Sequence, residues 1–398
     1  MPLPDPGEAV TAVVHRGTTA FDHLRPAWQA AVDRATRPSL FVTPTYVETA
    51  WQHFAAPGDE PWLVAVQGAE GALIGLLPLA CCVERRHGLP WRVLRHIGCW
   101  GGDRPGILHA GGEPAAIWRA VLDALLALRR DWQQLDLREL DQVSWLADVP
   151  DLSATGAPVT MALQPDTYSG VLTIRGTWEE YFASRSKNTR QAYRRRQRQL
   201  EEACPDLRIE VIDAAGDIAA AFDRYVAIER LGWKSEEAIG LWADPREIGF
   251  HHALLPQLAR TGQASVWLLR AGDRDIAGLV RLHQGSICYE RYSAFDPAYA
   301  RYSPGTLLCM EAVRQLFGTG CTESDVLGLH EPLAERPAIS AWYDDERATM
   351  RLTVTRQVPG LALARQARQA IRYVRQRPHT AGAAAVTAMA LAALSLAD

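Results

Sequence analysis

The chain is 398 residues long, which is enough for two or three domains of ordinary size. It has 42 Lys and Arg residues against 46 Asp and Glu residues, so its net charge is −4. This charge argues against a protein that binds nucleic acid through an overall positive excess. A hydrophobic fraction of 48% excludes an intrinsically disordered chain and predicts sizeable hydrophobic cores.

Helix-like and strand-like segments alternate over the first part of the chain, which we expect to be one half-domain covering residues 1–165. Apolar periodicity predicts helices over Trp28–Ala35 and Thr43–Phe54, strands over Pro61–Val66 and Ala72–Cys82, a Gly-rich loop over Trp91–Gly106, a helix over Ala115–Arg129 and a short strand over Gln134–Leu137. Thr43 or Thr45 lies where a helix needs a capping oxygen.

A second half-domain is expected over residues 166–356. Its predicted elements are a strand over Tyr168–Ile174, a long helix over Thr177–Ala203, a strand over Leu207–Ile212, helices over Ile218–Leu231 and Phe250–Arg260, a β-meander over Ala264–Ser293, a loop over Ala294–Pro304, a helix over Gly305–Phe317 and a strand near Glu323–Leu327. This order predicts an α/β fold with a mixed sheet.

The tail over residues 357–398 has a different composition. Arg365, Arg368, Arg372 and Arg375 recur along one helical face, and Ala381–Ala397 carries no charge. The apolar run is shorter than a membrane span. We expect a basic and then Ala-rich helical tail, which either packs on the protein or lies weakly on an anionic membrane surface.

The seven cysteines form no CxxC pair, so we expect buried thiols and no metal site. The first residues, MPLPDPGEAV, lack the basic start and apolar run of a signal peptide. A cytoplasmic location is therefore the expectation, with peripheral membrane association through the tail as the alternative.

The junction between a strand and a helix at Ala294–Leu308 (AFDPAYARYSPGTLL) is the first candidate for a site. The start of a helix presents free backbone N–H groups and a positive dipole end, which suit a phosphate or pyrophosphate. Gly305 allows close approach to the backbone, Pro304 fits a first helical position, and Arg301 offers a charge-assisted hydrogen bond. The alternative is an ordinary helix cap.

The predicted long helix carries a dense run of positive charge. No acidic residue interrupts its seven basic residues, which are Arg185, Lys187, Arg190, Arg194, Arg195, Arg196 and Arg198. We interpret them as a surface for an anionic ligand: the phosphates of CoA, an acidic glycan or a tRNA acceptor stem. A solvated helix face is the alternative.

Five segments follow one another in a distinctive order. They are Trp178 and Tyr181 before the basic helix, Arg230–Lys234 (RLGWK), the meander, YARYSPGTLL, and Ser324–Gly328 (SDVLG). Together they resemble the CelD/BcsL-like branch of the GNAT acyltransferases, which is associated with cellulose and exopolysaccharide biosynthesis. The segments LFVTPTYVETAW and LIGLLPL and the loop at Gly98–Asp103 are similar to the leading half-domain of the family, so the resemblance covers about residues 20–355.

The resemblance implies two tandem GNAT-like half-domains, with mixed, mostly antiparallel sheets flanked by helices, as in the related Fem-type peptidyltransferases. It also implies acetyl-CoA or another acyl-CoA as co-substrate, with Arg301, Ser303, Gly305 and Thr306 at the pyrophosphate. The sequence departs from the family loop Arg/Gln-x-x-Gly-x-Gly/Ala at Ser303-Pro304 and Thr306. It also lacks the family's Tyr-Lys-x-x-Trp, of which only Trp342 has a counterpart.

Acyl transfer from a thioester asks the protein to orient two substrates, move a proton and stabilise an oxyanion. The candidates for catalysis are Glu290 as base through water, Asp325 to orient an amine, Tyr302 to protonate the thiolate and His330 as alternative base. The candidates for substrate binding are Trp233, Lys234 and Arg194. For each of these residues the alternative is an ordinary structural role: a side chain that faces solvent, forms an ion pair, stands in a turn or packs against its neighbours.

Three functions remain open on the sequence. The leading one is an acyl-CoA-dependent N- or O-acyltransferase acting on a sugar, an amino acid or a similar small metabolite, in the context of polysaccharide biosynthesis. The second is a Fem-like peptidyltransferase that uses aminoacyl-tRNA and binds it through the basic helix. The third is a non-catalytic GNAT-like scaffold in a polysaccharide synthesis complex.

Overall fold

The computed structural model describes residues 10–86, 89–98, 104–141, 148–150, 158–232, 241, 244–329 and 331–357. The elements of the N-terminal half are β1 (Thr11–Arg16), α1 (Thr19–Arg34), η1 (Leu40–Val42), α2 (Pro44–Phe54), β2 (Glu60–Gln67), β3 (Leu73–Arg86), β4 (Leu89–His96), β5 (Leu108–His109), α3 (Pro114–Ala127), β6 (Gln134–Asp141) and β7 (Val159–Thr173). Those of the C-terminal half are α4 (Trp178–Ser184), α5 (Lys187–Ala203), β8 (Leu207–Ile212), α6 (Ile218–Leu231), α7 (Pro245–Ala259), β9 (Ala264–Ala271), β10 (Arg274–Gln284), β11 (Ile287–Phe295), η6 (Pro297–Tyr302), α8 (Pro304–Leu316), β12 (Glu323–Leu329), η7 (Leu333–Glu335), α9 (Pro337–Ser340) and β13 (Asp345–Arg356).

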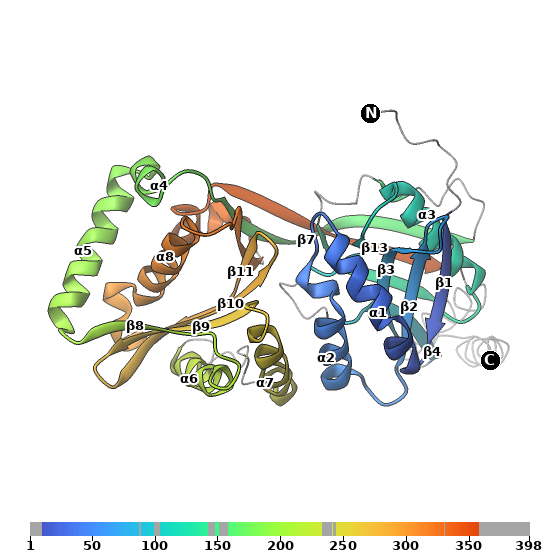
Figure 1. The fold of residues 1–398 in the computed structure, drawn as a ribbon, viewed down its shortest axis with the longest axis horizontal. Helices are drawn as coiled ribbons and strands as arrows, with labels where there is room; N and C mark the ends of the chain where they lie inside the picture. The colour runs from blue at the N-terminus through green and yellow to red at the C-terminus, as the bar shows by residue number, and fades with distance from the viewer. Residues whose placement is uncertain are drawn as a thin grey trace, which may run out of the picture.

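One mixed sheet runs through both halves of the described chain (Figure 1). Its strand order is β1-β2-β3-β4-β6-β13-β7-β12-β11-β10-β9-β8, with β5 beside β3. The two halves repeat one plan, because β1-α1-α2-β2-β3-β4-α3-β6 has the element order and strand pairing of β8-α6-α7-β9-β10-β11-α8-β12. In each half the last of these pairs, β4 with β6 or β11 with β12, is parallel and the others are antiparallel. The expected α/β class, with tandem halves and mostly antiparallel strands flanked by helices, is confirmed.

The final strands of the two halves are exchanged. β7 ends the N-terminal half but pairs with β12, whereas β13 ends the C-terminal half and pairs with β6. The two exchanged strands also pair with each other along their length, from Asp345 opposite Val171 to Arg356 opposite Val159. The expected boundary between residues 165 and 166 falls inside β7, and the expected two sheets are joined into one.

Helices cover both faces of the sheet, and the alternation of side chains along its strands explains why. On β2, Leu63 and Ala65 belong to a hydrophobic cluster with α1 and α2, whereas Trp62 and Val64 belong to a second cluster with α3. A strand buried on both faces has a nearly continuous apolar sequence, as this one does.

The first cluster continues from one half into the other. It includes residues of α1 and α2 together with residues of α6 and α7. Tyr46 of α2 meets Phe250 of α7 with 5.4 Å between ring centroids, and Gln257 Nε2 donates to Thr49 Oγ1 at 3.3 Å. In the C-terminal half, α8 packs on the other face of the sheet. Helices α4 and α5 contact α8 from its outer side (Figure 1).

Local predictions were accurate for strongly periodic segments. Helix α6 has the predicted bounds of Ile218–Leu231. Of the two predicted caps for α2, Thr43 is the one that accepts from the N–H of Tyr46. The predicted loop at Trp91–Gly106 is wrong in its first part, which belongs to β4. The cause is tertiary: β4 is held between β3 and β6, so pairing overrides its weak local pattern.

The predicted single helix over Thr177–Ala203 is also wrong, because it is two helices. Arg185 and Ser186 take extended ψ angles of 154° and 150°, which ends α4 and starts α5. The Ser186 hydroxyl then accepts from the N–H of Thr189 at 3.1 Å and caps the new helix.

The predicted tail lies, from residue 358 onward, outside the described residues. No helix in the described part of the chain is long and apolar enough to cross a membrane.

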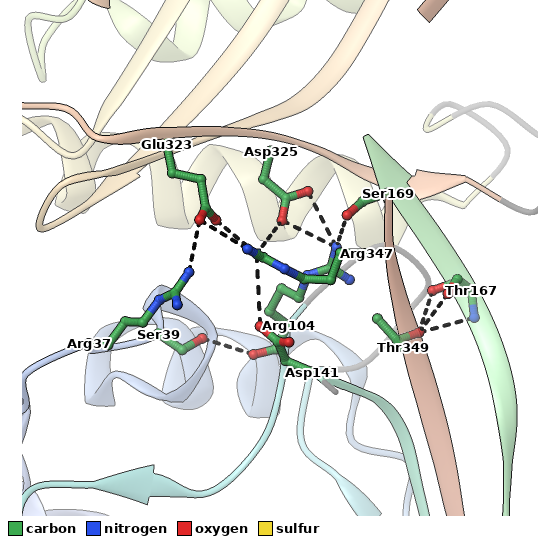
Figure 2. Close-up of polar contacts among 10 residues, drawn as sticks. All are labelled: Arg37, Ser39, Arg104, Asp141, Thr167, Ser169, Glu323, Asp325, Arg347 and Thr349. Atoms are coloured by element: carbon green, nitrogen blue, oxygen red, sulfur yellow. Dashed lines mark hydrogen bonds and ion pairs between the residues drawn. The ribbon is translucent and has the colours of Figure 1, made fainter. Parts of the chain in front are cut away.

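A buried cluster of arginines and carboxylates joins the two halves (Figure 2). Arg347 on β13 donates to Glu323 at 2.8 and 2.9 Å and to Asp325 at 3.3 Å. Arg104, from the N-terminal half, reaches the same Asp325 at 3.2 Å, and Arg37 donates to Glu323 at 2.9 Å. Each carboxylate at the start of β12 is therefore shared by two guanidinium groups.

The cluster lies in a low-dielectric environment. The Asp325 side chain is fully buried and that of Arg104 is 4% exposed. Burial raises the pKa of Asp325, and the guanidinium groups of Arg104 and Arg347 counter this rise. Against the effect of burial, the hydrogen bonds from Arg347 hold the pKa of Glu323 below its usual value. Removing Arg347 would take from each of these carboxylates one of its two guanidinium partners and leave buried negative charge only partly compensated.

We predict that Arg347→Met lowers the free energy of unfolding by about 3–5 kcal/mol in urea denaturation. The control is Arg246→Met, whose ion pair with Asp244 at 2.7 Å is exposed, so that its loss costs less than about 1 kcal/mol. Equal, small losses in the two variants would show that the buried cluster does not hold the halves together.

Candidate active site

The candidate site begins where strands β11 and β12 separate. They are parallel partners over only three residue pairs, the last being Tyr289 opposite Asp325. Beyond this point β11 continues to Phe295, whereas β12 keeps only its pairing with β7. The register between β11 and β10 also shifts here, which makes Arg291 an extra residue on β11. Such a bulge bends and twists a strand.

Helix α8 starts just after β11 and η6. Its N-cap, Ser303, has a left-handed backbone (φ 53°, ψ 53°) and makes no side-chain cap, and Pro304 occupies the first helical position. The N–H groups of Gly305 and Thr306 lie in the first turn, where a helix has no acceptor of its own. A Cβ at Gly305 would lie 3.3 Å from the ring of Phe295, so the glycine lets the end of β11 pack closely.

A cavity of about 500 Å³ lies beside this helix start. Its floor includes Ser303, Thr306 and Leu307 of α8. Its walls come from α5 and from the segment around α9, and they are Asn188, Thr189, Ala192, Tyr193, Arg196, Pro337, Ala338, Ala341 and Trp342. The bend predicted to hold a pyrophosphate therefore borders an open cavity and is not filled by neighbouring side chains.

The basic helix contributes to this cavity on one side and to a second cavity on the other. Arg196 lines the cavity at the start of α8, and Tyr193 packs against Trp342 with 5.3 Å between ring centroids. Arg194 instead lies over the ring of Phe182 at 5.2 Å and lines a separate cavity of about 340 Å³. Arg194 and the predicted pyrophosphate residues are thus not brought into one cavity.

Arg301 and Tyr302 form a pair next to the cavity without lining it. The Arg301 guanidinium lies 4.5 Å from the centroid of the Tyr302 ring and donates a short hydrogen bond to its hydroxyl. Tyr302 is 8% exposed and packs in the cluster under α8. The Tyr302 oxygen accepts this hydrogen bond, so the hydroxyl proton of Tyr302 can be donated to another group.

Glu290 is the first residue of β11 beyond its last pairing with β12. It is 6% exposed and accepts a hydrogen bond of 3.0 Å from Ser324 Oγ on β12. Arg281, opposite it on β10, donates to Cys288 Sγ at 3.2 Å and to the carbonyl of Ala312 at 2.8 Å. A buried carboxyl therefore stands at the point where the strands separate, backed by a buried guanidinium.

This environment changes how easily Glu290 gives up its proton. Burial raises the pKa of Glu290, and Arg281, Tyr343 and Ser324 only partly oppose the rise. A base with a pKa raised toward neutral pH can accept a proton and still be ionised when it is needed. Sequence reasoning selected Glu290 but gave no role to Ser324, although it opens the SDVLG segment, and did not select Tyr343, because tertiary folding alone brings the two hydroxyls to Glu290.

The remaining predicted residues lie elsewhere. Asp325 lies in the cluster between the halves, where its side chain contacts Arg104, Arg347 and Ser169. Trp233, Lys234 and His330 lie outside the described residues.

Six described cysteines are free, and burial raises the pKa of Cys288 to about 12, which keeps this thiol protonated. No group of His, Cys, Asp and Glu with metal-binding geometry occurs among the residues whose placement is described.

Comparisons with known proteins agree with this geometry. Residues 187–335 match a family described as Acetyltransferase (GNAT) domain. A conserved protein of unknown function from Bacteroides thetaiotaomicron VPI-5482 is similar in structure, with a TM-score of 0.54 and 9% identity over 84% of this chain and 97% of that chain. FemX is similar with a TM-score of 0.57 and 11% identity over 85% and 96% of the two chains. At these identities the likeness is one of fold, and the comparison with curated proteins gives no match. The chain therefore carries a GNAT acyltransferase domain in its C-terminal half.

We predict that Glu290→Gln becomes progressively more stable relative to wild type as pH rises from 4 to 7. The folded pKa of Glu290 lies above the unfolded value, so ionisation of the wild-type carboxyl at higher pH opposes folding. Unfolding midpoints measured across this range test the sign.

The control variant for that series is Glu210→Gln. Arg270 holds the pKa of Glu210 at about 2, so this carboxylate favours folding above its unfolded pKa and loses that effect as pH falls. Glu210→Gln should therefore lose stability relative to wild type as pH rises, opposite to Glu290→Gln. Parallel trends in the two variants would contradict the assignment of a raised pKa to Glu290.

Proposed function

We propose that the protein transfers an acyl group from acyl-CoA to an amine or hydroxyl of a small metabolite or sugar. The observation that carries this proposal is the cavity of about 500 Å³ at the start of α8. It combines open backbone N–H groups, a positive helix end and an arginine of α5 in one place. This combination suits the pyrophosphate and phosphate groups of CoA.

The donor site is proposed as follows. The N–H groups of Gly305 and Thr306 and the hydroxyl of Ser303 bind the pyrophosphate, and Arg301 stays outside the cavity lining, on Tyr302. Arg196 binds a further phosphate from the α5 wall. The apolar part of the donor then continues toward the point where β11 and β12 separate, since the start of α8 and this point are joined by the end of β11.

The reaction needs one base and one acid. The acceptor attacks the thioester carbonyl, its proton passes to Glu290 directly or through water, and collapse of the tetrahedral intermediate breaks the C–S bond. The CoA thiolate takes a proton, for which Tyr302 is the proposed donor because Arg301 supports its oxygen. Asp325 is proposed as a positioning residue, since its arginine partners hold β12 in place beside Glu290.

The class of acceptor follows from the resemblance to the CelD/BcsL-like branch. We infer a sugar or sugar-linked amine in polysaccharide synthesis, with Trp233 and Lys234 as candidate contacts and His330 as an alternative base. Because acyl-CoA is an intracellular co-substrate, the proposal places the reaction in the cytoplasm.

A second function is favoured by one observation. Arg195 and Arg198 of α5 are exposed and do not line the donor cavity, so the helix presents positive charge beyond what CoA requires. A tRNA that delivers an aminoacyl group would contact such a face through its phosphates. In this case the peptidyl transfer would use the same base but a different donor.

We predict that Arg196→Gln weakens acetyl-CoA binding about tenfold in isothermal titration calorimetry, because it removes one charge-assisted hydrogen bond. Gly305→Trp should abolish binding, since the indole would meet the ring of Phe295 and push the start of α8 away from the end of β11. The matched control is Arg198→Gln, which changes the net charge equally on an exposed position outside the cavity. Equal weakening by both glutamine variants would indicate non-specific attraction, and binding of charged tRNA that is weakened by Arg198→Gln alone would favour the second function.

We predict that Glu290→Gln lowers kcat by about 10²–10⁴ while leaving the Kd of acetyl-CoA unchanged. In the wild type, the acid limb of the kcat–pH profile should lie above the pKa of an ordinary glutamate, because burial raises the pKa of Glu290. An unchanged kcat and pH profile in the variant would remove Glu290 from the mechanism.

A further inference from the structure

The N-terminal half contains a cavity of its own, of about 560 Å³. It lies where β4 and β6 stop pairing: these strands are parallel over three residue pairs, and the last is Arg95 opposite Asp136. This is the same place in the fold at which β11 and β12 separate in the other half. The cavity shares no lining residue with the cavity at the start of α8, so it is a distinct site.

The lining of this cavity has two parts of different chemistry. One is apolar and comes from α2, with the side chains of Trp51 and Phe54. The other is built of ion pairs on the strands: Arg351 holds Asp136 through two hydrogen bonds of 2.6 and 2.7 Å, and Arg95 pairs with Glu84.

The formal charges that line the cavity cancel. Three arginines stand against three carboxylates, and these are Arg95, Arg138, Arg351, Asp59, Glu84 and Asp136. A site with this balance offers many fixed donors and acceptors without attracting either an anion or a cation. Planar guanidinium and carboxylate groups already locked in pairs are also preorganised, so a ligand need not order them.

His96 on the cavity wall has unused hydrogen-bonding capacity. It is 5% exposed, and neither ring nitrogen has a hydrogen-bond partner among the described residues. Burial lowers the pKa of His96 to about 3, so the ring is neutral and presents one donor and one acceptor. Buried polar groups are nearly always hydrogen-bonded, and an orphaned ring beside a large cavity indicates a missing partner.

We propose that this cavity binds a carbohydrate. A sugar ring has an apolar C–H face that packs on Trp51 and Phe54, and its hydroxyls both donate and accept, as His96 and the ion-paired wall require. It carries no charge, in keeping with the balanced lining. The volume lies in the range of small-molecule sites and admits more than one sugar ring.

The site does not depend on the donor cavity, so the two proposals can fail separately. Because the two cavities belong to different halves, a bound sugar here anchors or orients a longer glycan and is not itself acylated at Glu290. The kind of ligand is a neutral oligosaccharide.

The test is saturation-transfer NMR and calorimetry of the full chain with cellobiose and N-acetylglucosamine. Wild type should bind at least one of them, and His96→Phe should weaken binding about tenfold, the loss of one or two hydrogen bonds. Phe fills the same buried space without polar nitrogens, so the melting temperature without ligand should be unchanged or higher. If His96 had only a structural role, His96→Phe would not weaken sugar binding without also lowering the melting temperature.

The matched control is His283→Phe, the same change at a largely buried histidine of the other half that lies outside both cavities. Gly305→Trp should also keep sugar binding while losing acetyl-CoA. If His96→Phe fails to fold, Trp51→Ala removes the stacking wall at a partly exposed position and should weaken binding at least as much. Absence of binding by wild type, equal binding by His96→Phe, or displacement of the sugar by acetyl-CoA would each overturn the proposal.

Discussion

The interaction between Arg347 and the carboxylates at the start of β12 underlies the rest of the architecture. Arg347 lies on β13, which has crossed to pair with β6, and its hydrogen bonds at 2.8 and 2.9 Å hold Glu323 of the C-terminal half. Arg104 adds a contact from the N-terminal half to Asp325. Because these charges are buried, they tolerate little displacement. The exchanged strands therefore meet in one register, and the point at which β11 and β12 separate is fixed.

The two halves share a plan but differ in what stands at the equivalent place. In each, the parallel strand pair lasts three residues, and the next residue is buried and titratable: Glu290 in one half and His96 in the other. The carboxyl is bonded to Ser324, whereas the imidazole has no partner among the described residues. The repeated fold thus provides two openings, one for which we propose proton transfer beside a helix start that binds phosphate and one for which we propose a neutral polar ligand.

Sequence reasoning succeeded where local chemistry decides the outcome. The Ser-Pro-Gly bend was located because proline at a first helical position and a glycine beside it are local signals, and Glu290 lies, as predicted, on the strand before this bend. It failed at β1 and β13, which were not predicted, and at β4, which was read as a loop. These strands have weak or mixed patterns, and they are strands because their neighbours supply hydrogen-bonding edges. The contacts of Ser324 and Tyr343 with Glu290 were missed because they form only when distant segments pack together.

The sequence by itself determined the strongly periodic helices and strands, the helix start that presents free amides, and the density of positive charge on α5. All three depend on residues close together in the chain. Only the tertiary structure decided that β7 and β13 change places, that Arg196 faces the helix start whereas Arg194 faces another cavity, and that His96 lies in a second opening. Those outcomes depend on contacts between residues more than a hundred positions apart, or on which face of a helix a neighbour covers, and no local pattern encodes them.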